Sequence, residues 1–422
     1  MSPTQSVTVK PAVAKPLPGA WLVVGLLSVV GCLNYLDRIM ITTMRSSILE
    51  DMPMTDAQFG LLTSVFLWVY GLLSPFAGFL ADRFSRSRVI IVSLLIWSAI
   101  TYLTSWATTF EELLLTRALM GISEACYIPA ALALIADYHT GPTRSLATGI
   151  HMAGIMVGQG LGFVGGWLAE RQDWTLAFSL FGGVGVVYAF VLVGWLRDAP
   201  RLTESREASL TADTNLNLNF KSALGYLFSR GAYRQALLMW GLLGVVSWLI
   251  FGWLPTYFQE QFALPQSRAG LYATSYVYVA AFVGVLVGGA WADRWSRTNP
   301  RARMLVPAIG LCVAAPGVLL ASNTPVLTLA VAGFMTYALT RTFVDANLMP
   351  MLCLLIDARY RATGYGVLNL FICLVGGTGI YVGGILRDAR VDLSALFQTA
   401  GVLMLLCAGL LFTLRPQLES NF

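Results

Sequence analysis

Gly78-Phe-Leu-Ala-Asp-Arg-Phe-Ser-Arg86 and Gly289-Ala-Trp-Ala-Asp-Arg-Trp-Ser-Arg297 are two versions of one nine-residue segment, 211 positions apart in a chain of 422 residues. The offset is half the length of the chain, and each copy follows a long apolar stretch. A basic segment repeated at the same point of each half indicates that a helical membrane unit has been duplicated, which is the usual construction of secondary transporters.

The composition excludes an ordinary soluble domain. The chain is 57% hydrophobic and 12% charged, whereas soluble domains have about 25% charged residues. A helix that crosses a bilayer needs about 20 apolar residues. Twelve such stretches lie at 20–43, 58–81, 88–108, 112–136, 145–169, 175–196, 235–257, 268–292, 303–321, 325–352, 363–386 and 394–414. We therefore expect an all-α membrane protein with twelve transmembrane helices in two six-helix halves, 20–196 and 235–414, joined by a linker at 197–234 and flanked by tails at 1–19 and 415–422.

Basic residues gather in alternate connections, which sets the expected orientation. The arginine-rich connections are 82–88, 139–144, 197–234, 294–303 and 357–361. The other connections are mainly acidic, and their basic exceptions are Arg45, Arg171, Arg268, Arg387 and Arg390. Lys/Arg bias marks the cytoplasmic side, so we expect both termini in the cytoplasm of a bacterial-type inner membrane. The same bias explains the net charge of +5, which gives no argument for nucleic-acid binding.

Within the linker, Phe220, Leu224, Leu227 and Phe228 recur at helical spacing. They predict an amphipathic helix on the inner membrane face. A disordered tether that leads into the seventh span is the alternative.

Four ionisable residues in the first half lie at membrane depth, where each costs about 2.5–3.5 kcal/mol on insertion scales and needs a partner or a function. Glu124 is in the middle of the fourth span, and Arg117 is two turns earlier on the same helix face. Asp37 and Arg38 are in the outer half of the first span. These residues are candidates for proton coupling and anion binding, and intramembrane salt bridges are the structural alternative.

The duplication gives this set a counterpart in the second half. Arg341 and Asp345 are four residues apart in the tenth span, on one helix face. Aligning Pro129 with Pro350 places Glu124 opposite Asp345, each five residues before a proline. Paired positions of this kind line the cavity between the repeats of such transporters.

Uncharged polar residues in the spans are weaker candidates. Those that we expect to contact a substrate are Asn34, Tyr35, His151, Gln159 and Tyr337. Interhelical hydrogen bonding and packing are the structural alternatives for all of them.

The fifth span carries Gly154, Gly158, Gly162 and Gly166 at four-residue spacing. This stripe predicts close packing against another helix.

The duplicated segment resembles the G-x-L-x-D-R-x-x-R loop motif of the major facilitator superfamily. Three further stretches resemble its Spinster-type and anion:cation symporter branches: Asn34-Tyr-Leu-Asp-Arg38, Arg117-Ala-Leu-Met-Gly-Ile-Ser-Glu-Ala125, and the stretch from Ala136-Asp137-Tyr138 to Arg144. The resemblance implies that the Asp-Arg pair and the glutamate face a central cavity and serve proton coupling and anion binding. It also implies that Asp82, Arg83, Asp293 and Arg294 form a cytoplasmic gate. The drug:proton antiporter pattern fits less well, because its helix 5 proline is missing here.

The predicted function is proton-coupled transport of a small organic anion, such as a carboxylate or sugar acid, by alternating access. Arg38, Arg341 and Arg117 would attract the anion, Glu124 would carry the proton, and Asp37 and Asp345 would assist. The alternative is a Spinster-like exporter of lysolipid or another amphipathic molecule, and drug efflux or a non-transporting membrane sensor fits less well. We expect a monomer among membrane lipids, with no enzymatic activity, cofactor or metal site.

Overall fold

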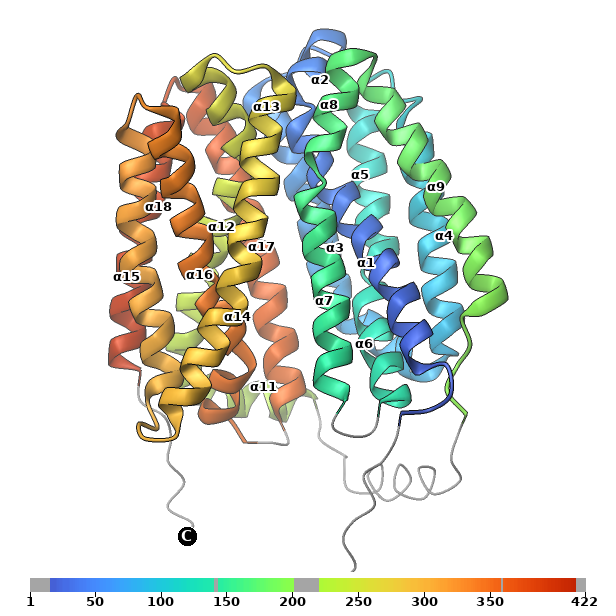
Figure 1. Cartoon of the computed structure of the whole chain (residues 1–422), viewed down its shortest axis with the longest axis vertical. Helices are drawn as coiled ribbons and strands as arrows, with labels where there is room; N and C mark the ends of the chain where they lie inside the picture. The colour runs from blue at the N-terminus through green and yellow to red at the C-terminus, as the bar shows by residue number, and fades with distance from the viewer. Residues whose placement is uncertain (1–15, 140–142, 201–219, 358–359, 415–422) are drawn as a thin grey trace, which may run out of the picture.

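A computed structural model describes residues 16–139, 143–200, 220–357 and 360–414, with the side chains at 78–79, 81–82, 220–221 and 362 outside the described part. The described chain is helical and contains twelve helical spans long and apolar enough to cross a membrane, in agreement with the twelve predicted stretches. In Figure 1 the helices of the first half lie on one side of the molecule and those of the second half on the other.

The spans of the first half are α1 (Ala20–Thr43), α3 (Asp56–Arg83), α4 (Arg86–Thr104), α5 with α6 (Phe110–Glu124 and Tyr127–Tyr138), α7 with α8 (Arg144–Gly160 and Phe163–Arg171) and α9 (Trp174–Trp195). Those of the second half are α12 (Gly231–Phe262), α13 with a π-helical turn and α14 (Gln266–Leu271, Tyr272–Tyr276 and Val277–Ser296), α15 (Ala302–Asn323), α16 (Leu327–Leu355), α17 (Arg361–Asp388) and α18 (Leu393–Thr413). Two short helices, α2 (Arg45–Asp51) and α11 (Phe220–Ser229), lie outside the spans.

Some boundaries differ from those predicted. The stretch from Phe220 is a helix, α11, which buries Ala223 and Leu227. The helix α12 already begins at Gly231, so it includes the last four residues of the predicted linker. The third span ends earlier than predicted. Its helix, α4, ends at Thr104, and the chain turns at Ser105 toward the start of α5.

Local sequence signals explain where several helices begin and break. Thr55 and Thr109 form capping boxes with the residues three positions later, which satisfy free N–H groups at the starts of α3 and α5. Pro129 has no N–H and its ring clashes with the carbonyl of residue i−4, which is Ala125. The fourth span therefore breaks at Ala125, and Glu124 becomes the last residue of α5.

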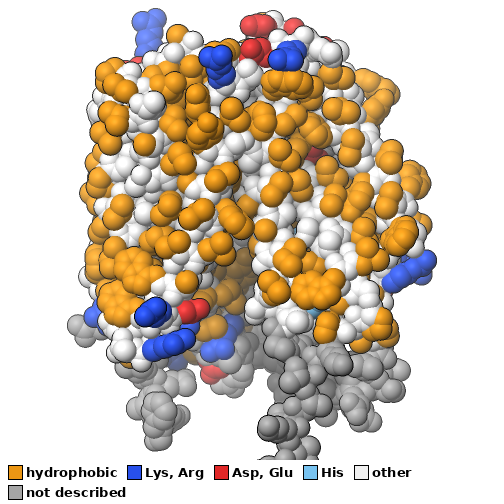
Figure 2. Space-filling view, viewed as in Figure 1, with side chains coloured by type: hydrophobic (Ala, Val, Ile, Leu, Met, Phe, Trp, Pro, Cys, Tyr) orange, Lys and Arg blue, Asp and Glu red, His pale blue; other side chains and the backbone are white. Residues whose placement is uncertain are grey.

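The two ends of the bundle differ. At one end, the closed end, α2, α8 and α13 lie close together; at the other, the open end, the described chain begins with α1 and finishes with α18 (Figure 1). Figure 2 shows the surface hollowed between the two halves in the part nearer the open end. The halves are thus in contact at the closed end and separated on this face at the open end.

Candidate functional site

The second half of α1 holds the first part of the site and is buried from Leu36 to Thr43. The helix α1 packs along its length against α7 and α8 through the glycine stripe, as the spacing predicted. A Cβ at Gly154 would lie 2.5 Å from the Ser28 carbonyl oxygen, and one at Gly158 would lie 2.0 Å from that of Cys32. Only glycine permits this approach, so the stripe fixes the depth and rotation of α1.

Arg38 and Glu124 form a buried ion pair between α1 and α5. The Arg38 Nε donates to Glu124 Oε2 at 2.6 Å, and the two side chains are 4% and 0% exposed. The guanidinium also lies over three aromatic rings, with centroid distances of 4.6 Å to Tyr35, 4.9 Å to Phe66 and 4.4 Å to Tyr70. Cation–π contacts of this kind add to the ion pair in stabilising the desolvated guanidinium.

Arg117 and Asp37 complete this N-half cluster, which we define as Asp37, Arg38, Arg117 and Glu124. Arg117 is fully buried, lies over the Phe66 ring at 5.1 Å and is close enough to interact electrostatically with both carboxylates. Asp37 Oδ2 accepts a hydrogen bond from Thr101 Oγ1 at 3.4 Å. Two acids and two arginines balance in formal charge.

The hydrogen bonding of the N-half cluster is incomplete. Within the described part of the chain, four groups include buried atoms without a hydrogen-bond partner: Asp37 Oδ1, Glu124 Oε1, Arg38 Nη2, and Arg117 Nε and Nη2. Buried polar atoms in this condition cost free energy. The cluster therefore contains both donors and acceptors without partners inside one buried site.

The second half contributes Arg341 and Asp345, which form the predicted i,i+4 ion pair at 2.5 Å between Nη1 and Oδ2. This pair is more exposed than the N-half cluster, at 14% for Arg341 and 41% for Asp345. Tyr337 lies one turn earlier on the same helix, α16, and is buried. Tyr35 of α1 is close enough to interact electrostatically with Arg38 and Glu124 of the first half and with Asp345 of the second.

The two arginines that were expected to attract an anion, Arg38 and Arg341, differ in their acidic partners and in their exposure. The structure gives Arg38 the carboxylate of Glu124 from another helix, whereas Arg341 is the more accessible arginine.

The remaining polar candidates lie in two places. Asn34 is buried beside Glu124 and belongs with the N-half cluster. His151 is buried against α1, with its ring 5.9 Å from that of Tyr127, whose hydroxyl donates to the Leu27 carbonyl oxygen. Gln159 is half-buried on α7. In the described chain, neither of these α7 residues forms a hydrogen bond or an ion pair with the N-half cluster or with the Arg341–Asp345 pair.

Of the predicted gate residues, Asp293 pairs with Arg303 at 2.8 Å, within its own half. Arg83 and Arg294 are exposed. The side chain of Asp82 lies outside the described residues.

Phe66 and Thr101 are site residues that the sequence reasoning missed. An apolar ring or a single hydroxyl in a span gives no signal until its neighbours on other helices are known.

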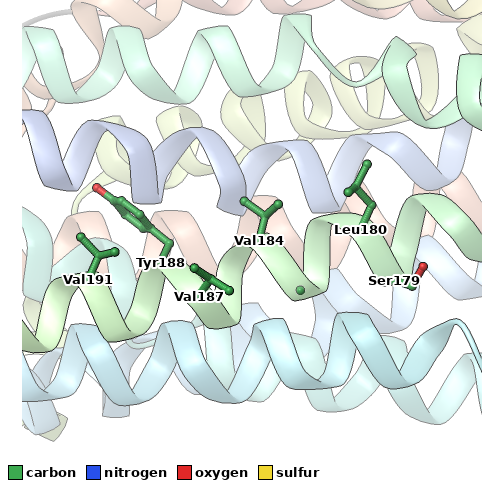
Figure 3. Close-up of a pocket in the computed structure, with 7 residues that line it drawn as sticks. Ser179, Leu180, Val184, Val187, Tyr188 and Val191 are labelled. Carbon is green, nitrogen blue, oxygen red and sulfur yellow. The ribbon is translucent and has the colours of Figure 1, made fainter.

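A separate apolar depression in the surface lies along α9, lined by Ser179, Leu180, Gly183, Val184, Val187, Tyr188 and Val191 (Figure 3). Several of these side chains are exposed on the outside of the bundle, among them Val187 at 65%. Its lining contains no carboxylate and no arginine, so it is distinct from the charged site.

Twelve spans in two halves, with charged groups inside the spans of both halves, are typical of a membrane transporter. The family model of the Major Facilitator Superfamily matches residues 27–380, and the chain belongs to this superfamily. This is a superfamily of multi-pass membrane transporters and not a class of enzymes.

Two curated relatives come from Xenopus tropicalis. Protein spinster homolog 1 is 29% identical over 311 residues, which are 70% of this chain and 58% of the relative. The sphingosine-1-phosphate transporter SPNS2 is 30% identical over 305 residues, 68% of this chain and 57% of the relative. The chain thus spans less than two thirds of the length of these relatives.

Two solved structures share the fold. Both are of a bacterial homologue of the human lysosomal transporter Spinster in an inward-facing conformation. The occupied form has a TM-score of 0.74 and 22% identity and covers 94% of this chain and 97% of its own. The unoccupied form has a TM-score of 0.71 and 23% identity, with 94% and 96% covered.

Proposed function

We propose that this protein moves an amphipathic, lipid-like molecule with an anionic head group across the membrane, coupled to protons. This reverses the order of the two functions considered from the sequence, where a small organic anion came first. The similarity to Spinster proteins and to a transporter of sphingosine-1-phosphate, which has a phosphate group and an apolar chain, supports the reversal.

The observation that carries the proposal is an asymmetry between the two seams that join the halves. Along one seam α3 and α17 stay in contact over several turns. Ser64 Oγ donates to the Gly377 carbonyl oxygen at 2.6 Å, Trp68 Nε1 donates to that of Leu374 at 3.1 Å, and Asn369 Nδ2 donates to a serine hydroxyl at 3.3 Å.

Along the other seam α7 meets the π-helical turn before α14, near the closed end of α7. The Gly160 carbonyl oxygen accepts hydrogen bonds from Ser275 of this turn at 2.6 Å and from Thr274 at 3.2 Å. Farther toward the open end these helices diverge (Figure 1), and the surface is hollowed between the halves (Figure 2). An opening on one seam only would let an apolar chain reach the interior from the lipid, which a small soluble anion does not need.

In this proposal the head group binds in the second half. Arg341 is the accessible arginine, and its planar guanidinium suits a phosphate or carboxylate. Asp345 competes for the same group, so an anionic ligand would displace it. The N-half cluster would carry the proton, on Glu124 or Asp37. With the termini in the cytoplasm, as the arginine bias predicts, the open end faces inward.

The test is uptake by purified protein in liposomes, with lysolipids, sphingoid phosphates and small carboxylates compared with and without a pH gradient. Transport of the amphipathic compounds alone supports the proposal. Transport of the small carboxylates alone would return the organic anion to first place.

A matched pair of variants tests the proton site. Glu124→Gln should abolish accumulation driven by a pH gradient while sparing exchange, because the neutral amide cannot release a proton. Glu112→Gln is the control on the same helix, since glutamine also completes the capping box at the start of α5. Wild-type accumulation by Glu124→Gln would remove this residue from the coupling mechanism.

A further inference from the structure

The closed end is joined by charged groups that cross from one half to the other. Asp56, at the start of α3, forms ion pairs with Arg45 of its own half and with Arg387 of the other, the latter at 3.0 Å. Glu260 of α12 binds Arg387 at 2.7 Å and lies 3.9 Å from Arg45. Within the described chain, the ion pairs between the halves are those of Asp56 with Arg387 and of Arg45 with Glu260, and both are at this end.

Asp388 adds a helix cap across the same boundary. Its two carboxylate oxygens accept hydrogen bonds from the backbone N–H groups of Asp56 at 2.9 Å and Ala57 at 3.0 Å. These are the first N–H groups of α3, a helix of 28 residues, and they have no partner within their own helix. A carboxylate at this position is stabilised by the helix dipole as well as by the hydrogen bonds.

Further hydrogen bonds extend the contact to α8 and α13. Gln266 of α13 donates from Nε2 to Ser47 Oγ at 3.0 Å and to the Gly166 carbonyl oxygen at 3.2 Å. The Ser267 N–H donates to Glu170 at 2.6 Å. Both seams of the molecule are therefore fastened at this end.

Three charged residues of this contact are largely buried, so solvent screens their interactions only weakly. Arg45, Asp56 and Arg387 are 13%, 14% and 12% exposed. The two guanidinium groups lie 5.8 Å and 5.3 Å from the buried Trp253 ring. Two arginines held this close repel each other unless acids stand between them. Loss of Asp56 would leave Glu260 as the acid in contact with both arginines and would therefore weaken the attraction between the halves.

We propose that Arg45, Asp56, Glu260, Arg387 and Asp388 form a latch that keeps the closed end shut and must open in every transport cycle. In the structure this closed-end latch does the work that the sequence assigned to the opposite end. There, Asp293 binds an arginine of its own half and does not connect the halves.

Spin-label distances across the closed end test the latch without any substrate. Labels are attached at Glu50→Cys and Ala389→Cys, exposed positions in different halves at this end, after the six native cysteines are changed to serine. Asp56→Asn and Arg387→Gln should each raise the ratio of long to short distances at least tenfold. Glu111→Gln, which removes an exposed acid at the same end, should leave the ratio unchanged.

A reversible cross-link separates gate opening from loss of structure. A Cβ at Gly270 would lie 3.3 Å from the Thr43 Cβ of the other half, close to the spacing that a disulfide needs. In the Asp56→Asn background, oxidation of Thr43→Cys with Gly270→Cys should remove the long distances, and reduction should restore them. Long distances that persist in the oxidised, cross-linked protein, or an unchanged ratio in both latch variants, would overturn the proposal.

Discussion

Replacing Gly158 by alanine should destabilise the protein more than any comparable change on the same helix. The new Cβ would lie 2.0 Å from the carbonyl oxygen of Cys32, and 2.7 Å and 2.8 Å from the carbonyl carbon and Cα of that residue. Relaxed contacts between carbon and oxygen are about 3.3 Å or longer, so α1 and α7 must separate by roughly an ångström. The obstacle is backbone and cannot rotate away.

Overpacking of this kind costs about 1–3 kcal/mol, and the upper end applies where only backbone can move. For a unit of about 180 residues this corresponds to a fall in melting temperature of roughly 5–10 °C. Thermal unfolding of the detergent-purified protein, followed by tryptophan fluorescence or by the onset of aggregation, measures the fall.

Gly149→Ala is the matched control. It is on the same helix, α7, and its Cβ would meet no atom within 4 Å. Alanine should be neutral or slightly stabilising there, because glycine is the poorer helix former by up to about 1 kcal/mol. If the two variants melt within about 2 °C of each other, the seam is looser than the structure indicates and the reasoning fails.

Three further changes have distinct expected outcomes. Arg38→Lys keeps the charge but loses the planar group that lies over three rings, so the initial uptake rate in liposomes should fall about tenfold, the equivalent of 1.4 kcal/mol; an unchanged rate would show that only the charge matters. Asp345→Asn frees Arg341 from its competitor, so an anionic ligand should bind several-fold more tightly in a thermal-shift titration, whereas weaker binding would make Asp345 itself a ligand group. Burial works against the charged form of Asp198, but hydrogen bonds from Ser85 and Ser87 outweigh it and lower the pKa of this carboxyl. The ionised Asp198 therefore stabilises the fold above its unfolded-state pKa, and this contribution is lost as the pH falls through the folded-state pKa. The Asp198→Asn variant should have a lower melting temperature than the wild type at pH 7 and nearly the same melting temperature near pH 3. A difference in melting temperature that does not change with pH would refute this.

The spans could be predicted from the sequence because length and apolar composition are enough to define them. The Arg341–Asp345 pair could also be predicted, since both residues lie on one helix and the helical repeat places them together. The bond between Arg38 and Glu124 could not, because it depends on how α1 and α5 are rotated against each other. That rotation is set by packing such as the glycine seam, and the sequence reveals the seam without revealing which helix occupies it.

The closed-end latch could not be predicted from the sequence, for a related reason. Arg45 and Arg387 stood out in the sequence only as exceptions to the arginine bias, and Asp56 and Glu260 only as acids of the expected sign. Arg45 and Asp56 are near each other in the chain, but Arg387 is 331 residues from Asp56. The four residues come together because of how four helices are arranged in the fold. Only this arrangement explains why Arg45 and Arg387 stand in connections that are otherwise mainly acidic.

The balanced charge of the N-half cluster has an electrical consequence. With both acids ionised the four groups sum to zero, and one bound proton makes the sum +1. A singly charged anionic head group carried at the same time cancels that charge. The loaded protein then changes conformation without moving net charge through the membrane field. Each uncompensated charge would instead contribute about 2.3 kcal/mol per 100 mV. Transport of a monoanion with one proton would then proceed at the same rate in polarised and depolarised vesicles, and a doubly charged phosphate would be driven out of a cell by its negative interior.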